Sequence, residues 1–225
     1  MFDYIDNYCE RLDPSFWAEP LNAVSNLSFI LSGLLILILL KNHHTMASKI
    51  LVTILLSIGI GSFLFHTYAQ TWAAIADVVP ILLFILVYVY FSTHVYLQQS
   101  KLVSALSVIA FFPFAIGTSA AISALFGPLN GSTLYISVAL LIGLYAIAMI
   151  RKNRKTAAGL AVGAALLGVS IAFRSVDQAL CQSIPQGTHF MWHLLNGVML
   201  GWMIMVLHRF TKRDKHSLAP IPPAL

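Results

Sequence analysis

Residues 78–94 read VVPILLFILVYVYFSTH, an apolar segment that contains no Asp, Glu, Lys or Arg. An apolar stretch of about 17 to 25 residues can cross a hydrocarbon core of about 30 Å as an α-helix. Similar stretches lie on both sides of this one in a chain of 225 residues that is 59% hydrophobic and 9% charged. Soluble domains carry about 25% charged residues, so the sequence predicts an all-α, polytopic membrane protein.

We expect a bundle of seven transmembrane helices. They cover residues 22–40, 50–66, 78–94, 102–126, 134–150, 157–173 and 190–207. The connections are too short for a soluble domain. The chain therefore divides into an acidic N-terminal segment (1–21), one helical domain (22–208) and a basic, Pro-rich tail (209–225). The N-terminus lacks the basic n-region of a cleavable signal peptide, so we expect the first span to be retained.

The charged residues are distributed unevenly between the two sides of the predicted bundle. Eleven of the 13 Lys and Arg residues follow spans one, three, five and seven, and the other two are Arg11 and Arg174. Seven of the eight acidic residues lie on the side of Arg11 and Arg174. Because Lys and Arg favour cytoplasmic loops, we expect the N-terminus outside and the C-terminus in the cytoplasm. The net charge of +5 does not indicate nucleic-acid binding, because the basic residues are split among membrane-edge loops without interleaved aromatic residues.

The two cysteines are Cys9, before the first span, and Cys181, between the last two spans. Both are expected on the oxidising, extracytoplasmic side, where disulfides persist. A bridge between them would tie the N-terminal segment to the last outer loop, and two unpaired thiols are the alternative.

Four ionisable residues lie at the outer ends of the predicted spans: His66, Asp77, His189 and His193. An ionisable side chain inside a span costs about 2.5 to 3.5 kcal/mol on insertion scales, so it usually has a partner or a function. His189 and His193 are four residues apart and share a helix face, and His66 is expected at the same depth. Three histidines and a water form a common catalytic zinc site, which predicts zinc here. A hydrogen-bonded structural pair is the alternative interpretation of the HxxxH spacing.

Ser62 and Asp77 are candidate catalytic residues beside this site. Ser62 lies one helical turn before His66 on the same face and would offer a hydroxyl group next to the metal. Its alternative role is a hydrogen bond to its own helix backbone. Asp77 would accept a proton or orient the attacking water. Its alternative role is to cap the N-terminus of the helix that follows.

Four segments in a fixed order carry a resemblance to known proteins. They are Tyr8-Cys-Glu10 with Trp17-Ala-Glu-Pro-Leu-Asn-Ala-Val-Ser-Asn26, then Gly61-Ser-Phe-Leu-Phe-His66, then Asp77, then His189-Phe-Met-Trp-His193. Their order and spacing resemble those of the alkaline ceramidases and their bacterial relatives, in a seven-transmembrane hydrolase superfamily that includes adiponectin-receptor-like proteins. The resemblance implies zinc on the three histidines, with Ser62 and Asp77 assisting catalysis. It also implies a disulfide between Cys9 and Cys181.

The same resemblance implies a lipid pocket and a calcium site. Trp192 and Tyr135 match positions that line the pocket, although a Trp at this depth is also a common interfacial anchor. Carboxylate oxygens suit calcium, and the implied ligands are Asp6, Glu10, Asp13 and Glu19. The pattern departs from that of the family at Asn7 and Leu12. A solvated acidic segment is the alternative interpretation.

Together these features predict a zinc-dependent amidase with its active site near the extracytoplasmic face. Its substrate would be the N-acyl amide of ceramide or a related membrane lipid, and its products a sphingoid base and a fatty acid. The expected partners are the bilayer and this lipid. The alternatives are a hydrolase of another N-acyl or ester lipid, and a receptor-like or membrane-perturbing protein with a structural zinc. A transporter is disfavoured because no paired broken helices indicate inverted repeats.

Overall fold

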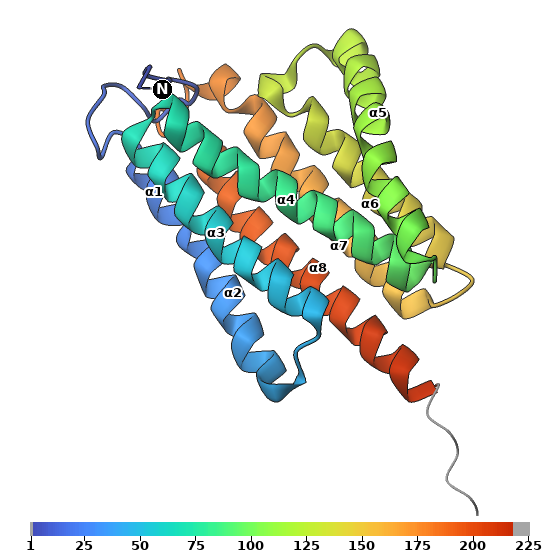
Figure 1. Ribbon diagram of the computed structural model, residues 1–225. Helices are drawn as coiled ribbons and strands as arrows, with labels where there is room; N and C mark the ends of the chain where they lie inside the picture. The colour runs from blue at the N-terminus through green and yellow to red at the C-terminus, as the bar shows by residue number, and fades with distance from the viewer. Residues whose placement is uncertain (1, 218–225) are drawn as a thin grey trace, which may run out of the picture.

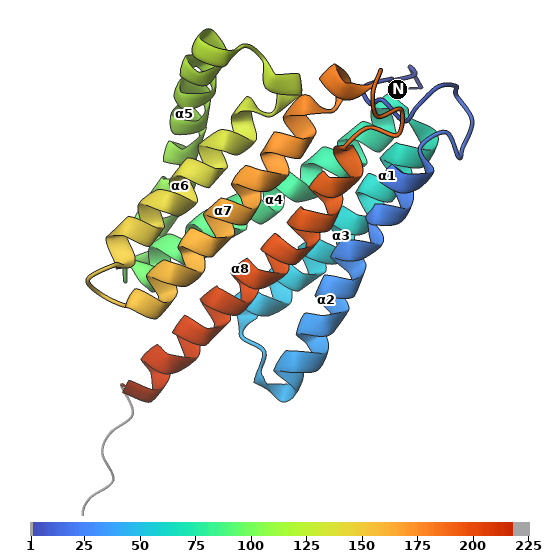
Figure 2. The ribbon, with the colours of Figure 1, turned by 180° about the vertical axis from the view of Figure 1, so that it is seen from behind.

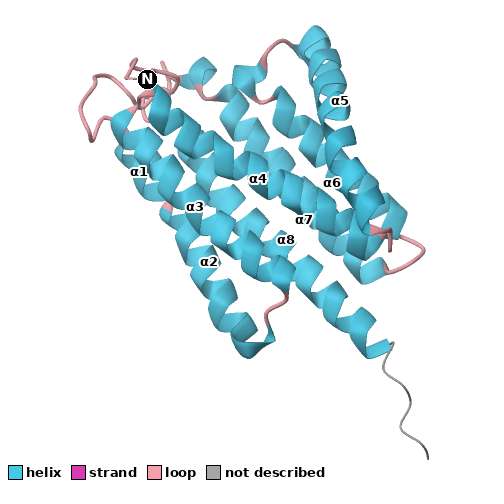
Figure 3. Cartoon of the chain, viewed as in Figure 1, coloured by secondary structure: helices cyan, strands magenta, loops and turns pink. Residues whose placement is uncertain are grey.

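The computed structural model describes residues 2–217, which form helices joined by loops (Figures 1 and 3). The α-helices are α1 (Pro20–Ser25), α2 (Leu27–Leu40), α3 (Met46–Tyr68), α4 (Thr71–Tyr96), α5 (Lys101–Phe126), α6 (Thr133–Met149), α7 (Arg154–Val176) and α8 (His189–Ser217). Short 3-10 helices are η1 (Lys41–His43), η2 (Leu129–Gly131) and η3 (Gln178–Leu180). No β-strand occurs within residues 2–217, so the prediction of an all-α protein is confirmed. The predicted tail lies outside the described residues from residue 218 onward.

Six of the described segments are long and apolar enough to cross a membrane: Pro20–Leu40, which combines α1 and α2, and the helices α3, α4, α5, α7 and α8. The other predicted span corresponds to α6, an apolar helix of 17 residues. This length is at the short end of the membrane-spanning range of about 17 to 25 residues. Large apolar side chains such as those of Leu31, Ile109 and Ile147 are exposed on the bundle surface, where lipid would cover them. The chain is a polytopic membrane protein.

Polar residues in the connections determine where several helices begin. Thr45 and Ser48 form a reciprocal capping box at the start of α3. The side chain of Asn153 accepts a hydrogen bond from the N–H of Thr156 at the start of α7. Both helices therefore begin several residues before the spans expected at 50–66 and 157–173, because the capping residues lie outside the apolar segments.

The helix α8 packs against α1, α2, α3, α4 and α7 and so joins both sides of the bundle (Figure 2). The helix α5 lies at the edge, where it packs against α4 and α6 (Figure 1). The contact of α7 with α8 is close: a Cβ atom at Gly159 would lie 2.9 Å from a methyl group of Val206. The indole N–H of Trp202 also donates to the carbonyl oxygen of Gly159 at 2.7 Å.

The N-terminal segment lies at one end of the bundle, and α8 ends at the opposite end (Figure 1). We call the first of these the N-terminal end. An isolated β-bridge between Tyr4 and Gln70 holds the segment to the connection between α3 and α4. A disulfide between Cys9 and Cys181 joins it to the connection between α7 and α8, with the Cα atoms 5.2 Å apart, so the predicted pairing is confirmed. The segment is thus fixed over the ends of four helices, whereas its extracytoplasmic location stays a prediction from charge.

Candidate metal centre

Three histidine side chains meet at the N-terminal end of the bundle. His66 lies near the end of α3, and His189 and His193 lie in the first two turns of α8. Their ring centroids are 4.6 to 5.2 Å apart, and one nitrogen of each ring lies within 4.8 Å of the other two. All three side chains are buried. The structure therefore brings the three predicted ligands together.

Neighbouring oxygen atoms fix the orientation of two of these rings. Nδ1 of His66 lies 2.6 Å from Oε2 of Glu19, and Nδ1 of His193 lies 2.7 Å from Oγ of Ser25. Hydrogen bonds of this kind hold a metal-binding imidazole in one tautomer. Nε2 of His66 and Nδ1 of His189 are buried and have no hydrogen-bond partner among the described residues. Because buried polar atoms normally have partners, these free nitrogens fit a metal ion such as zinc.

Tyr8 covers one side of the cluster. Its ring stacks on that of His189, with the centroids 3.7 Å apart. Its hydroxyl group accepts a hydrogen bond of 2.8 Å from Nη1 of Arg174. Burial raises the pKa of Tyr8 to about 12, although the charge of Arg174 opposes the shift. Tyr8 is therefore uncharged at neutral pH and acts as an aromatic packing surface for the histidine.

Ser62 and Asp77 lie next to the histidines where α3 contacts α4. Ser62 is buried one turn before His66, and its side chain lies close enough to Asp77 to interact with the carboxyl group. Oδ1 of Asp77 is buried and has no hydrogen-bond partner among the described residues. The alternative in which Asp77 caps its helix is wrong, because α4 begins at Thr71 and its N-cap residue is Gln70. Asp77 therefore lies inside α4, beside Ser62, with one carboxylate oxygen unpartnered among the described residues.

Gly61 allows α3 and α4 to approach each other at this level. A Cβ atom at this position would overlap the carbonyl oxygen of Ala76 and lie 2.7 Å from the carbonyl carbon. Only a residue without a side chain fits such a contact. Ala76 directly precedes Asp77, so the glycine determines how close the carboxyl group comes to the helix that carries His66.

Asp177 positions His189, a role that was not predicted from the sequence. Oδ1 of Asp177 accepts hydrogen bonds from the N–H groups of Thr188 at 2.6 Å and His189 at 2.9 Å, and Oδ2 accepts one from the N–H of Cys9 at 3.1 Å. A carboxylate at this position satisfies free N–H groups at the start of α8 and complements the helix dipole. An acidic residue shortly before the last span was the only sequence signal for this role.

Arg174 also lies beside the site, although the sequence pattern indicated no role for it in the site. Cζ of its guanidinium group is 5.3 to 5.7 Å from the ring centroids of Tyr8, Tyr135 and Trp192. An arginine within about 6 Å of aromatic faces is stabilised by cation–π attraction. The group also interacts electrostatically with Asp77. The site thus contains a positive charge on the side of Trp192.

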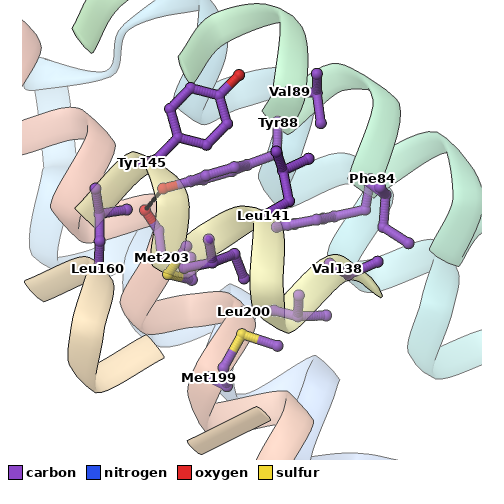
Figure 4. A pocket seen from close by; sticks show the side chains of 12 residues that line it. Phe84, Tyr88, Val89, Val138, Leu141, Tyr145, Leu160, Met199, Leu200 and Met203 are labelled. Carbon is purple, nitrogen blue, oxygen red and sulfur yellow. Dashed lines mark hydrogen bonds between the residues drawn. The ribbon is translucent and has the colours of Figure 1, made fainter. Parts of the chain in front are cut away.

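Two neighbouring pockets with mainly apolar linings lie inside the bundle. The first pocket is lined by Tyr135 and Trp192, whose ring centroids are 4.7 Å apart, together with Asn196 and apolar side chains. The second pocket lies between α4, α6, α7 and α8 and includes Tyr88 in its lining (Figure 4). The two pockets share the side chains of Ile85, Val138, Met199 and Leu200. Tyr135 and Trp192 therefore both lie in the lining of the first of these pockets.

The acidic residues that the resemblance assigns to calcium are engaged in other contacts. Glu10 uses its two carboxylate oxygens to accept the N–H groups of Leu21 at 2.6 Å and Asn22 at 2.8 Å. Asp13 accepts a backbone N–H two residues further along the chain, and Asp6 is exposed. Within residues 2–217, the four acidic residues form no group whose carboxylates share the position of one ion.

Glu19 is buried, and the oxygens of its carboxylate contact Arg11, Asn22 and His66. Burial raises the pKa of Glu19, but hydrogen bonds with His66 and Asn22 and the charge of Arg11 hold it below its ordinary value. Glu19 is therefore an ionised carboxylate whose oxygens are already occupied. In this arrangement the four acidic residues do not fit a calcium ion.

Comparison with known protein families supports the resemblance seen in the four sequence segments. The family model described as Ceramidase matches residues 6–219, a range that contains every residue of the site. A search of the curated proteins gave no match. The family match covers most of the chain, and the chain therefore belongs to the ceramidase family.

Proposed function

We propose that this protein is a zinc-dependent amidase that hydrolyses the N-acyl amide of ceramide or a related membrane lipid. The products are a sphingoid base and a fatty acid. The observation that carries the proposal is the buried cluster of His66, His189 and His193, with unpartnered ring nitrogens within reach of one ion. Membership of the ceramidase family supports a hydrolase that acts on a ceramide-type lipid.

The ligand set favours zinc over harder cations. Imidazole nitrogen is a preferred zinc ligand, whereas magnesium and calcium prefer oxygen. Three protein ligands also leave a fourth position open, as in catalytic zinc sites, while structural sites usually have four protein ligands. When bound, zinc would act as a Lewis acid that lowers the pKa of water to about 7 and polarises the amide carbonyl.

Asp77 is the general base and acid in this proposal. Its unpartnered Oδ1 can accept a proton from the attacking water and deliver the same proton to the leaving amine nitrogen, so the carboxylate is regenerated. Ser62 lies beside it and can donate a hydrogen bond to the amide oxygen as negative charge develops there. The two residues would thus divide proton transfer and oxyanion stabilisation between them.

The apolar pockets suit the hydrocarbon chains of the substrate. With the amide at the histidines, an acyl chain would pass Tyr135 and Trp192 and extend towards Tyr88. An apolar lining with few polar groups is typical of a lipid-binding cavity. We retain the extracytoplasmic location of the site, and the division into an N-terminal segment, a helical domain and a tail, as parts of the proposal.

Zinc content and ceramide hydrolysis, measured on the same detergent-purified samples, test the proposal. His66→Ala and His189→Ala should lose the metal and the activity together. His43→Ala is the matched control, because His43 is exposed in η1 at the other end of the bundle, and it should retain both. Wild-type activity in metal-free protein would contradict the proposal. Protein that binds zinc but hydrolyses no acyl lipid would favour a structural role for the metal.

A further inference from the structure

The guanidinium group of Arg11 is enclosed by oxygen atoms. Nε donates to Oε1 of Glu19, and Nη2 donates to the carbonyl oxygen of His66 at 3.0 Å. Nη1 donates to the carbonyl oxygens of Asp13 and Ser15 at 3.3 and 3.4 Å. The side chain is buried. A buried charge is stable only when it is paired and hydrogen bonded, and these contacts meet that requirement.

The oxygen atoms around Arg11 are of the type that a hard metal cation prefers. A carboxylate of Glu19 and backbone carbonyls from three residues converge on one positive group, as such ligands do around calcium. The guanidinium group is permanently charged, so the chain itself supplies the cation. Arg11 thus links Asp13, Ser15, Glu19 and His66 without an added ion.

Arg11 is also connected to His66 in two ways, through Glu19 and by a direct hydrogen bond. Glu19 connects the guanidinium group to Nδ1 of His66, because its two oxygens contact one group each. The direct hydrogen bond to the carbonyl oxygen of His66 fixes the backbone of the same residue. One cation thus holds both the ring and the backbone of a proposed zinc ligand.

We propose that Arg11 is a built-in cation that takes the place of calcium in the N-terminal segment and positions Glu19 and His66 for metal binding. Neither the fold nor the site of this protein then requires calcium. The statement about zinc binding rests on the proposed function, whereas the statement about calcium does not.

Thermal unfolding of the full-length wild-type protein tests the calcium statement. Unfolding is followed in detergent in calcium-free buffer and after addition of calcium chloride, with the zinc content checked in both samples. The two unfolding temperatures should agree, because a ligand that does not bind the folded protein does not stabilise it. A higher unfolding temperature of the wild type in calcium would overturn the proposal.

Two variants test whether the oxygen atoms around Arg11 form a cation site. Arg11→Gln removes the charge, and Arg11→Lys keeps it as the matched control. Without calcium, Arg11→Gln should unfold at a lower temperature and bind zinc about 10- to 100-fold more weakly than the wild type, with Arg11→Lys between them. Calcium should raise the unfolding temperature and zinc affinity of Arg11→Gln. Magnesium, which requires a tighter octahedral site, should do so less.

If Arg11→Gln without calcium is as stable as the wild type and binds zinc equally tightly, Arg11 does not position Glu19 and His66. A loss of stability that calcium does not reverse would contradict the cation site. Both measurements are made without substrate. They therefore do not depend on hydrolysis, and failure of the amidase proposal would appear instead as zinc-loaded protein that does not hydrolyse the lipid. If Arg11→Gln cannot be purified, the effect of calcium on the unfolding temperature of the wild type still tests whether this protein binds calcium.

Discussion

Replacement of Gly61 by alanine should push α4 away from α3 and displace Asp77 from the histidines. The new Cβ atom would overlap the carbonyl oxygen of Ala76 and lie 2.7 Å from its carbonyl carbon, whereas ordinary contacts begin at 3.4 Å. Both atoms belong to the backbone of α4, so no side-chain rotation relieves the overlap. The helices must separate by at least about 0.7 Å to restore an ordinary contact.

This displacement has a cost in both stability and rate. Overpacking of a tight contact costs about 1 to 3 kcal/mol, while alanine gains up to about 1 kcal/mol over glycine as a helix former. The net loss of stability should therefore be about 0 to 3 kcal/mol. Misplacement of a catalytic group by about 1 Å costs on the order of 100-fold in rate, so we expect Gly61→Ala to lose about 10- to 100-fold in kcat.

The assay is ceramide hydrolysis together with zinc content and thermal unfolding of the same preparation. Gly61→Ala should keep its zinc, because the contact between α3 and α8 is unchanged, and lose rate. Gly117→Ala in α5 is the control, since a Cβ atom at Gly117 meets nothing within 4 Å, and its rate should equal that of the wild type. A wild-type rate for Gly61→Ala would refute the claim that the close contact of α3 with α4 positions Asp77 for catalysis.

Three further substitutions test individual contacts of the site. Ser25→Ala removes the hydrogen bond to Nδ1 of His193 and should weaken zinc binding about 10- to 100-fold, measured by competition with a chelator. Unchanged zinc affinity would show that this hydrogen bond does not support metal binding. Asp177→Asn places an amide donor against one of its N–H partners and should lower stability by about 1 to 3 kcal/mol, measured by denaturant unfolding. An unfolding midpoint equal to that of the wild type would count against the capping role. Ser62→Ala should lower kcat about 100- to 1,000-fold and leave zinc content unchanged, and loss of zinc instead would assign Ser62 to metal binding.

The helices and the common depth of the histidines could be predicted from the sequence, because both depend on local properties. Apolar runs reveal membrane spans, and a spacing of four residues places His189 and His193 on one helix face. The depth of His66 could be predicted from its position at the end of a span. The pairing of Cys9 with Cys181 came from the family resemblance, and the structure agrees with it.

The side chains that orient the histidines could not be predicted in the same way. Glu19 is 47 residues from its partner His66, and Ser25 is 168 residues from its partner His193. Such contacts depend on how the N-terminal segment folds over the bundle, which no local pattern encodes. The family resemblance implied calcium in that segment, and the contacts of Arg11 with Glu19 and with the carbonyl oxygens of Asp13, Ser15 and His66 appear only in the folded structure.

X-ray absorption at the zinc edge, on detergent-purified wild-type protein, tests whether the three histidines bind zinc. The spectrum should show three imidazole nitrogens at about 2.0 to 2.1 Å from the zinc and one oxygen ligand. His66→Ala should lose this spectrum. Protein that is active without zinc, or a zinc spectrum unchanged in His66→Ala, would contradict the assignment of the three histidines as the metal site.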